Sequence, residues 1–176
     1  MFSKLMDEKK EAILTRWVDL IFKTYPADSH GFFTNNSDPF GNPVGTAVKR
    51  ETRAIFDELR GEFDPENIEK SLDAVIRIRA VQEFSSSRAV SFIFMLKQAV
   101  LEELKGDLGD AGILKDVITL FGRIDEMALA AFDIHMDCRE KVNKIRLDEA
   151  KRRVAFNLAE RHRGSRRKPE DLNDGE

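Results

Sequence analysis

The chain of 176 residues is 41% hydrophobic and 35% charged, which suits one globular domain and excludes an intrinsically disordered class. No window approaches about 18 uncharged apolar residues, and the N-terminal stretch MFSKLMDEKKEAIL carries charges where a secretory signal requires an apolar run. We therefore expect neither membrane insertion nor secretion. The single cysteine, Cys138, excludes an intrachain disulfide framework and leads us to expect a cytoplasmic protein.

The net charge of −3 hides an uneven distribution along the chain. Residues 139–168 contain twelve Lys or Arg and four Asp or Glu, a net charge of +8, whereas the last eight residues, PEDLNDGE, carry −4. Residues 1–138 therefore carry −7. We expect the acidic body, the basic segment and the acidic end to have different roles.

Apolar residues at helical spacing predict three helices in the first half of the chain. The first runs over residues 4–25 and is stopped by Pro26. The second begins near Pro43 or Val44, because proline is tolerated in a first turn, and ends at Gly61. The third follows Asp64, where the sequence Asp-Pro-Glu supplies an N-cap, a first-turn proline and a first-turn acid.

Two further helices are predicted after the break at residues 84–87, where a serine can cap the next helix. The fourth helix, residues 88–104, is apolar nearly all round at its centre, so we expect it to be the most buried. The fifth runs over 113–163 and is expected to place many residues in the core before residue 139: Ile113, Leu114, Val117, Ile118, Leu120, Phe121, Ile124, Met127, Leu129, Phe132 and Ile134.

The apolar residues thin out after Arg139, and a helix that is polar on most faces projects from its domain or pairs with a partner. The predicted fold class is all-α, a helical bundle (globin-like or related) with a long projecting C-terminal helix. We expect a helical sensory bundle over residues 1–138, a basic helical extension over 139–163 and a disordered tail over 164–176.

The predicted connection over residues 26–43 is unusual, since loops longer than about 12–15 residues are uncommon and often functional. It contains Phe32, Phe33 and Phe40. We expect these rings to fold back on the bundle, because leaving all three exposed would create an interaction patch. The loop is then an ordered lid that either caps the core or covers a ligand cavity.

Motifs for catalysis or metal binding are absent from the sequence. Neither HExxH, paired CxxC, GxGxxG nor GxxxxGK[ST] occurs, so we expect a protein without enzymatic activity, bound metal or cofactor. His135 can be interpreted as a haem ligand, a phospho-accepting histidine or a partly buried structural residue. We favour the structural interpretation, because His135 falls where the last helix leaves the predicted bundle.

The basic segment after residue 138 allows three interpretations. Cys138, Val142 and Ile145 fit a coiled-coil a/d pattern, which favours pairing with a second helix, although Glu149 and Arg152 break its continuation. Arginines can instead bind nucleic acid through phosphates, and a basic helix can lie on an anionic membrane surface. The arginines concerned are Arg152, Arg153, Arg161, Arg163, Arg166 and Arg167.

Several stretches together resemble the RsbRD-type N-terminal domain, the sensory half of an RsbT co-antagonist. They are Trp17, YPADSHGFF (25–33), DPFGNPVG (38–45), FDELRG (56–61), IRIRAVQEFSSSRAVSFIFMLKQAVLEEL (76–104) and AFDIHMDCREKVNKIR (131–146), followed by EAKRR (149–153). The resemblance covers about residues 10–155. In multidomain relatives a STAS domain follows; this chain ends in a basic helix and an acidic tail, so we expect a stand-alone copy.

The resemblance implies a stress-response regulator that is homodimeric and passes a signal through its last helix. Combined with the residues, it predicts a non-enzymatic cytoplasmic signalling domain whose partner contacts are Cys138, Val142, Ile145, Arg152 and Arg153. One alternative is a small-molecule or haem sensor that uses the bundle and loop 26–43. Its candidate pocket residues are Trp17, Phe32, Phe33, Phe40 and His135. A second alternative is a nucleic-acid-associated regulator that uses the basic helix.

Overall fold

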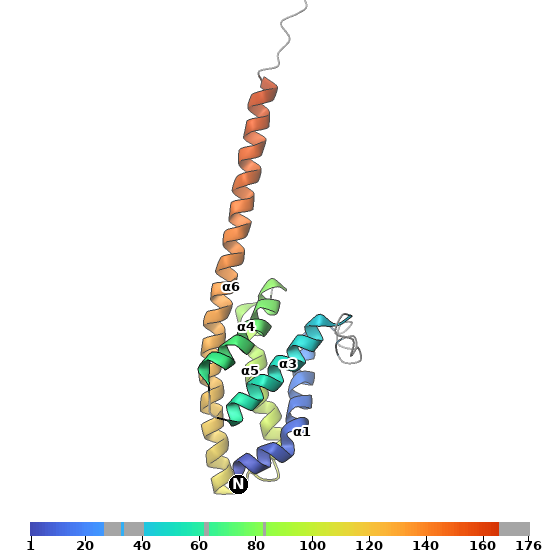
Figure 1. Cartoon of the computed structure of the whole chain (residues 1–176), viewed down its shortest axis with the longest axis vertical. Coiled ribbons are helices and arrows are strands. Elements are labelled where there is room, and N and C mark those ends of the chain that lie inside the picture. Colours follow the sequence, from blue (N-terminus) through green and yellow to red (C-terminus); the bar gives the residue numbers. More distant parts are fainter. Residues whose placement is uncertain (27–32, 34–40, 62–63, 83, 166–176) are drawn as a thin grey trace, which may run out of the picture. The chain divides into compact units, whose positions relative to one another are not determined.

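The computed structural model describes residues 1–26, 33, 41–61, 64–82 and 84–165, except for the side chains of Pro65 and residues 162–165. The expected all-α class is confirmed, and no strand occurs within these ranges (Figure 1). The helices are α1 (Phe2–Phe22), α3 (Pro43–Arg60), α4 (Pro65–Val81), α5 (Ser86–Leu104) and α6 (Ala111–Ser165). None of the described helices combines the length and the apolar character needed to cross a bilayer.

Short polar residues set the helix boundaries, as the sequence predicted. The Asp64 carboxylate accepts a hydrogen bond from the Glu66 backbone N–H at 2.9 Å, and Pro65 occupies the first turn of α4. The Ser85 hydroxyl accepts the Arg88 N–H at 3.4 Å and caps α5. Helix α1 ends at Phe22, earlier than expected, because the next backbone bonds, from Thr24 N–H to Ile21 O and from Tyr25 N–H to Phe22 O, have the tighter three-residue spacing.

The chain forms two units, Met1–Cys138 and Arg139–Glu176. In the first unit α1 packs mainly on α5, and α3 packs mainly on α4. The largest fully buried apolar side chains come from α1, α3 and α5, namely Trp17, Phe22, Phe56 and Phe92. Burying each such side chain stabilises the fold by about 1.5–3 kcal/mol relative to exposure.

The core of the first unit uses only one side of α6, which corrects part of the sequence prediction. Ile113, Val117 and Ile124 are buried as expected. Leu114, Ile118, Leu129 and Phe132 were expected in the core but are 43%, 63%, 70% and 44% exposed. A helix repeats every 3.6 residues, so the bundle covers one stripe of α6 and leaves the apolar residues beside that stripe in solvent.

Helix α5 is likewise less completely buried than predicted. Phe92, Ile93 and Leu96 are buried, but Phe94 and Leu101 are 47% and 39% exposed. The apolar run over residues 92–96 therefore includes both a core side and a solvent side.

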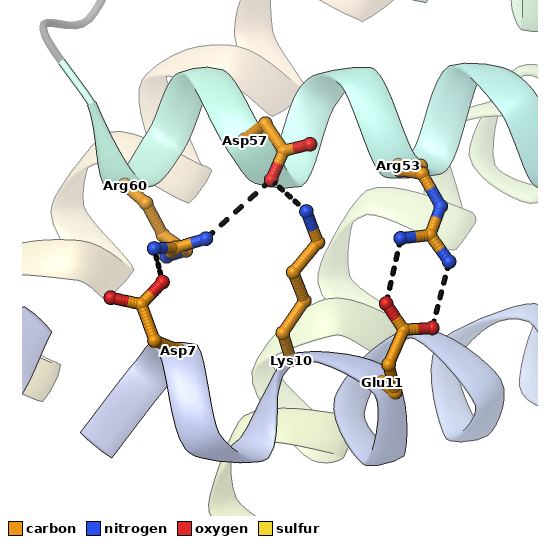
Figure 2. Close-up of polar contacts among 6 residues, drawn as sticks. All are labelled: Asp7, Lys10, Glu11, Arg53, Asp57 and Arg60. Carbon is orange, nitrogen blue, oxygen red and sulfur yellow. Dashed lines mark hydrogen bonds and ion pairs between the residues drawn. The ribbon is translucent and has the colours of Figure 1, made fainter. Parts of the chain in front are cut away.

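Ion pairs join α1 to α3 along one side of the first unit (Figure 2). The Arg53 guanidinium donates to both carboxylate oxygens of Glu11 at 2.7 Å. The other two contacts join Lys10 to Asp57, at 2.5 Å, and Arg60 to Asp7. The bidentate geometry favours one register of the two helices, although exposed ion pairs of this kind add little to the stability of the fold.

Candidate functional site

Trp17, the first predicted pocket residue, lies in the centre of the core. Its side chain is fully buried, and its indole Nε1 donates a hydrogen bond to the Phe92 backbone oxygen at 2.6 Å. The Trp17 and Phe92 rings stack with centroids 6.5 Å apart. Trp17 therefore fixes α1 against α5 with both its apolar surface and its polar atom.

Phe33 is the only one of the three loop phenylalanines within the described residues; Phe32 and Phe40 lie outside them. The Phe33 ring lies 5.4 Å from that of Phe22 and 4.9 Å from that of Tyr25. The Phe33 side chain thus packs back against the end of α1, in agreement with the expectation for this residue.

Asn42 connects Phe33 to the start of α3. The Asn42 side chain is 1% exposed; its Oδ1 accepts the Gly45 N–H at 2.8 Å, and its Nδ2 donates to the Phe33 backbone oxygen at 3.1 Å. A Cβ atom on Gly45 would lie 2.7 Å from the Asn42 Cγ and closer still to its two terminal atoms. The Asn42-Pro43-Val44-Gly45 sequence therefore combines a helix cap, a first-turn proline and the glycine that leaves room for the cap.

A buried arginine, Arg79, forms a feature that the sequence analysis missed. It is 0% exposed, and its guanidinium donates to the Arg88 backbone oxygen at 2.8 Å and to the Thr24 hydroxyl at 3.0 Å. It also lies over three aromatic rings at 5.0–5.5 Å, those of Tyr25, Phe84 and Phe92. Arg79 thereby ties the end of α1 to the α4–α5 turn.

Burial is the main cause of the pKa shifts of Arg79 and Tyr25 in this aromatic cluster. Burial lowers the pKa of Arg79, and the nearby Tyr25 opposes that shift. Burial also raises the pKa of Tyr25, and Arg79 opposes it. The faces of the three rings carry partial negative charge, so they stabilise the guanidinium where water cannot reach it. One sequence signal for Arg79 was available: it follows the buried Leu72 by seven residues, on the same side of α4.

A cavity of about 780 Å³ lies beside this cluster, and its lining includes Thr24, Tyr25, Phe33, Phe84 and Arg88. The structure therefore brings Phe33 to the cavity, while Trp17 packs in the core against Phe92. His135 is also fully buried, in α6. Among the described residues, no cluster of three or more His, Cys, Asp or Glu side chains could hold a metal ion.

The predicted partner contacts follow one another along α6, which is a single helix of 55 residues. Cys138 is a free thiol, 7% exposed, at the end of the first unit. Val142 is partly buried, Ile145 is 61% exposed, and Arg152 and Arg153 are exposed. The side chain of Arg163, together with Arg166 and Arg167, lies outside the described set, as does the expected tail from residue 166 onward.

Residues 139–161 of α6, called the arm below, lack the apolar packing of the first unit. Among their side chains only Arg139 and Val142 are partly buried, and all others are exposed. The exposed apolar side chains of the arm include Val154 and Phe156, at 59% and 63%. The arm thus offers a long surface for contact with another chain.

Comparison with known protein families gives a match over residues 11–150 to the family described as "RsbT co-antagonist protein rsbRD N-terminal domain". The chain belongs to this family, which indicates a regulatory domain of stress signalling. Comparisons with curated proteins and with solved structures found no match.

Proposed function

We propose that this chain is a non-enzymatic cytoplasmic signalling domain that acts as a homodimer through protein–protein contacts. The first unit receives the signal, and the arm carries it to a partner through Cys138, Val142, Ile145, Arg152 and Arg153. Membership of a regulatory family supports the regulatory part of the proposal.

The observation that carries the proposal is the continuity of α6. Its first part supplies core residues such as Val117 and Ile124, and the same helix continues without interruption through the exposed arm. A change in packing around the first part therefore alters the rotation or position of a helix that a partner can contact. Shifts of about 1–2 Å in a packed helix are a common way to transmit such changes.

The exposure of the arm supports a partner for it. Helices in proteins owe most of their stability to packing of an apolar face, and isolated helices of modest length are marginal in water. The arm lacks such packing among its described side chains. Pairing with the arm of a second copy would cover Val142, Ile145 and Phe156.

Hydrogen exchange of the full chain tests this proposal. If the arms pair, backbone amides of residues 139–161 exchange more slowly as the protein concentration rises from about 1 μM to several hundred μM, because association lowers the open population. The substitutions Val142→Glu and Ile145→Glu together should abolish that concentration dependence, whereas Lys151→Gln, at an exposed arm position outside the proposed contacts, should preserve it. Arm exchange that is identical at all concentrations would refute pairing of the arms. Arm protection that instead requires added DNA, and is lost steeply with salt, would assign the arm to nucleic acid.

A further inference from the structure

A row of apolar side chains on α6 lies exposed within the first unit. It consists of Leu114, Ile118, Leu129, Phe132 and Met136, which are 43–70% exposed. Their spacing follows the helical repeat, so they form one stripe beside the buried one. An apolar stripe that the core does not use requires another explanation.

Two exposed apolar residues on α5, Phe94 and Leu101, extend the same surface. They are seven residues apart and therefore lie on one side of α5. Lys97, between them, lies over the ring of Phe94 at 5.8 Å and that of Phe121 in α6 at 5.1 Å. Its ammonium group also pairs with Asp125 of α6 at 2.6 Å, so Lys97 connects the row on α5 with the row on α6.

We call these seven residues the α5–α6 face: Phe94, Leu101, Leu114, Ile118, Leu129, Phe132 and Met136. A fully exposed large side chain presents a surface of about 200 Å². Multiplied by the exposed fractions of the seven residues, this gives an exposed surface of roughly 700 Å². The largest apolar patch of a typical monomer covers about 300–600 Å², and each partner in a stable interface buries about 800 Å². The face is therefore larger than a monomer usually leaves exposed, and it comes close to the area that each partner of a stable dimer buries.

We infer that the α5–α6 face is where a second copy of this chain docks, a step that rests on the homodimer of the proposed function. The charges near its centre, on Lys97 and Asp125, are already paired with each other. The face therefore does not require an oppositely charged partner, and an apolar surface can pack against itself across a two-fold axis. Two helices from each copy would then form a four-helix arrangement at the interface.

Sedimentation velocity of the full chain between about 1 and 200 μM tests the inference. The substitutions are Ile118→Glu and Leu129→Glu, singly and together, at the two most exposed positions of the face. Val81→Glu is the matched control, because Val81 is 71% exposed in α4 and is not part of the face. All four variants should keep their thermal transition at low concentration, since charge is introduced where water already reaches the side chain.

We expect wild type and Val81→Glu to dimerise with the same Kd. The double variant should raise the Kd about 100-fold or more, because each change occurs on both sides of a symmetric interface. A double variant that dimerises like wild type would overturn the inference. If dimerisation is then lost only with Val142→Glu and Ile145→Glu, the proposed function stands and the α5–α6 face is not its interface. A wild-type chain that stays monomeric throughout overturns both.

Discussion

Asn42 and Gly45 act as one unit at the start of α3, and substituting either tests this directly. The Asn42 side chain is buried and makes two hydrogen bonds, to the Gly45 N–H and to the Phe33 backbone oxygen. A Cβ at position 45 would lie 2.7 Å from the Asn42 Cγ, well inside contact distance. We therefore expect Gly45→Ala to displace the Asn42 side chain and to disrupt its two hydrogen bonds.

The size of the effect follows from three contributions. Loss of an N-cap costs about 1 kcal/mol, and a buried amide left without its partner costs about 1–3 kcal/mol. Alanine is more favourable than glycine inside a helix by about 1 kcal/mol, which offsets part of that loss. We therefore expect Gly45→Ala to lower the free energy of unfolding by about 1–3 kcal/mol.

The sign should reverse when Asn42 is removed first. In an Asn42→Ala background the cap is already lost, and the three side-chain atoms nearest the Cβ at position 45 are gone, so Gly45→Ala should raise the free energy of unfolding by up to about 1 kcal/mol. Urea unfolding of the wild type, both single variants and the double variant measures this coupling. Gly122→Ala in α6 is the control, because no atom lies within 4 Å of its added Cβ. Equal destabilisation by Gly45→Ala in both backgrounds would refute the steric explanation.

Three other predictions concern single side chains. Arg79→Lys should lower the free energy of unfolding by about 2–3 kcal/mol, which is more than Arg79→Met does. Lysine keeps a buried charge but cannot donate to both the Arg88 oxygen and the Thr24 hydroxyl. Urea unfolding in which methionine is the worse substitute would contradict this. The hydrogen bond from Arg53 lowers the pKa of Glu11 below 4.5, so its stabilisation is present above pH 4.5 and is lost as the pH falls below it. Glu11→Gln should therefore be less stable than wild type near neutral pH, and the difference should shrink in unfolding experiments at acidic pH; a constant difference would argue against the pair. Asp64→Ala should cost about 1 kcal/mol through loss of the α4 cap, with little change for Asp64→Ser, as measured by thermal or urea unfolding.

The helix boundaries were predictable because the signals that set them are local. Asp64 with Pro65, and Ser85 before α5, carry their cap chemistry within three residues. The role of Asn42 was missed, although Pro43 was recognised, because the crowding between Asn42 and Gly45 depends on the folded conformation of both residues.

Periodicity identified the apolar residues of α5 and α6 but did not assign their surroundings. Leu114 and Val117 are equally suitable for a core, yet the first is 43% exposed and the second 1% exposed. Which side of a helix is covered depends on the direction of its neighbours, and that is a property of tertiary packing. For the same reason the spacing from Leu72 could place Arg79 on the buried side of α4 but could not assign its partners, which lie just after α1, in α5 and in the turn between α4 and α5.

The placement of Trp17 has a practical consequence for spectroscopy. The chain has a single tryptophan and a single tyrosine, and both belong to the first unit. Because the indole is buried and hydrogen-bonded to Phe92, its emission should be blue-shifted in the folded chain and should report the packing of α1 on α5. Melting of the arm should not change the tryptophan emission, because the arm contains neither tryptophan nor tyrosine. The one aromatic residue among its described residues is Phe156. Fluorescence and far-ultraviolet circular dichroism should therefore give separate transitions if the arm unfolds independently, and coincident ones if it does not.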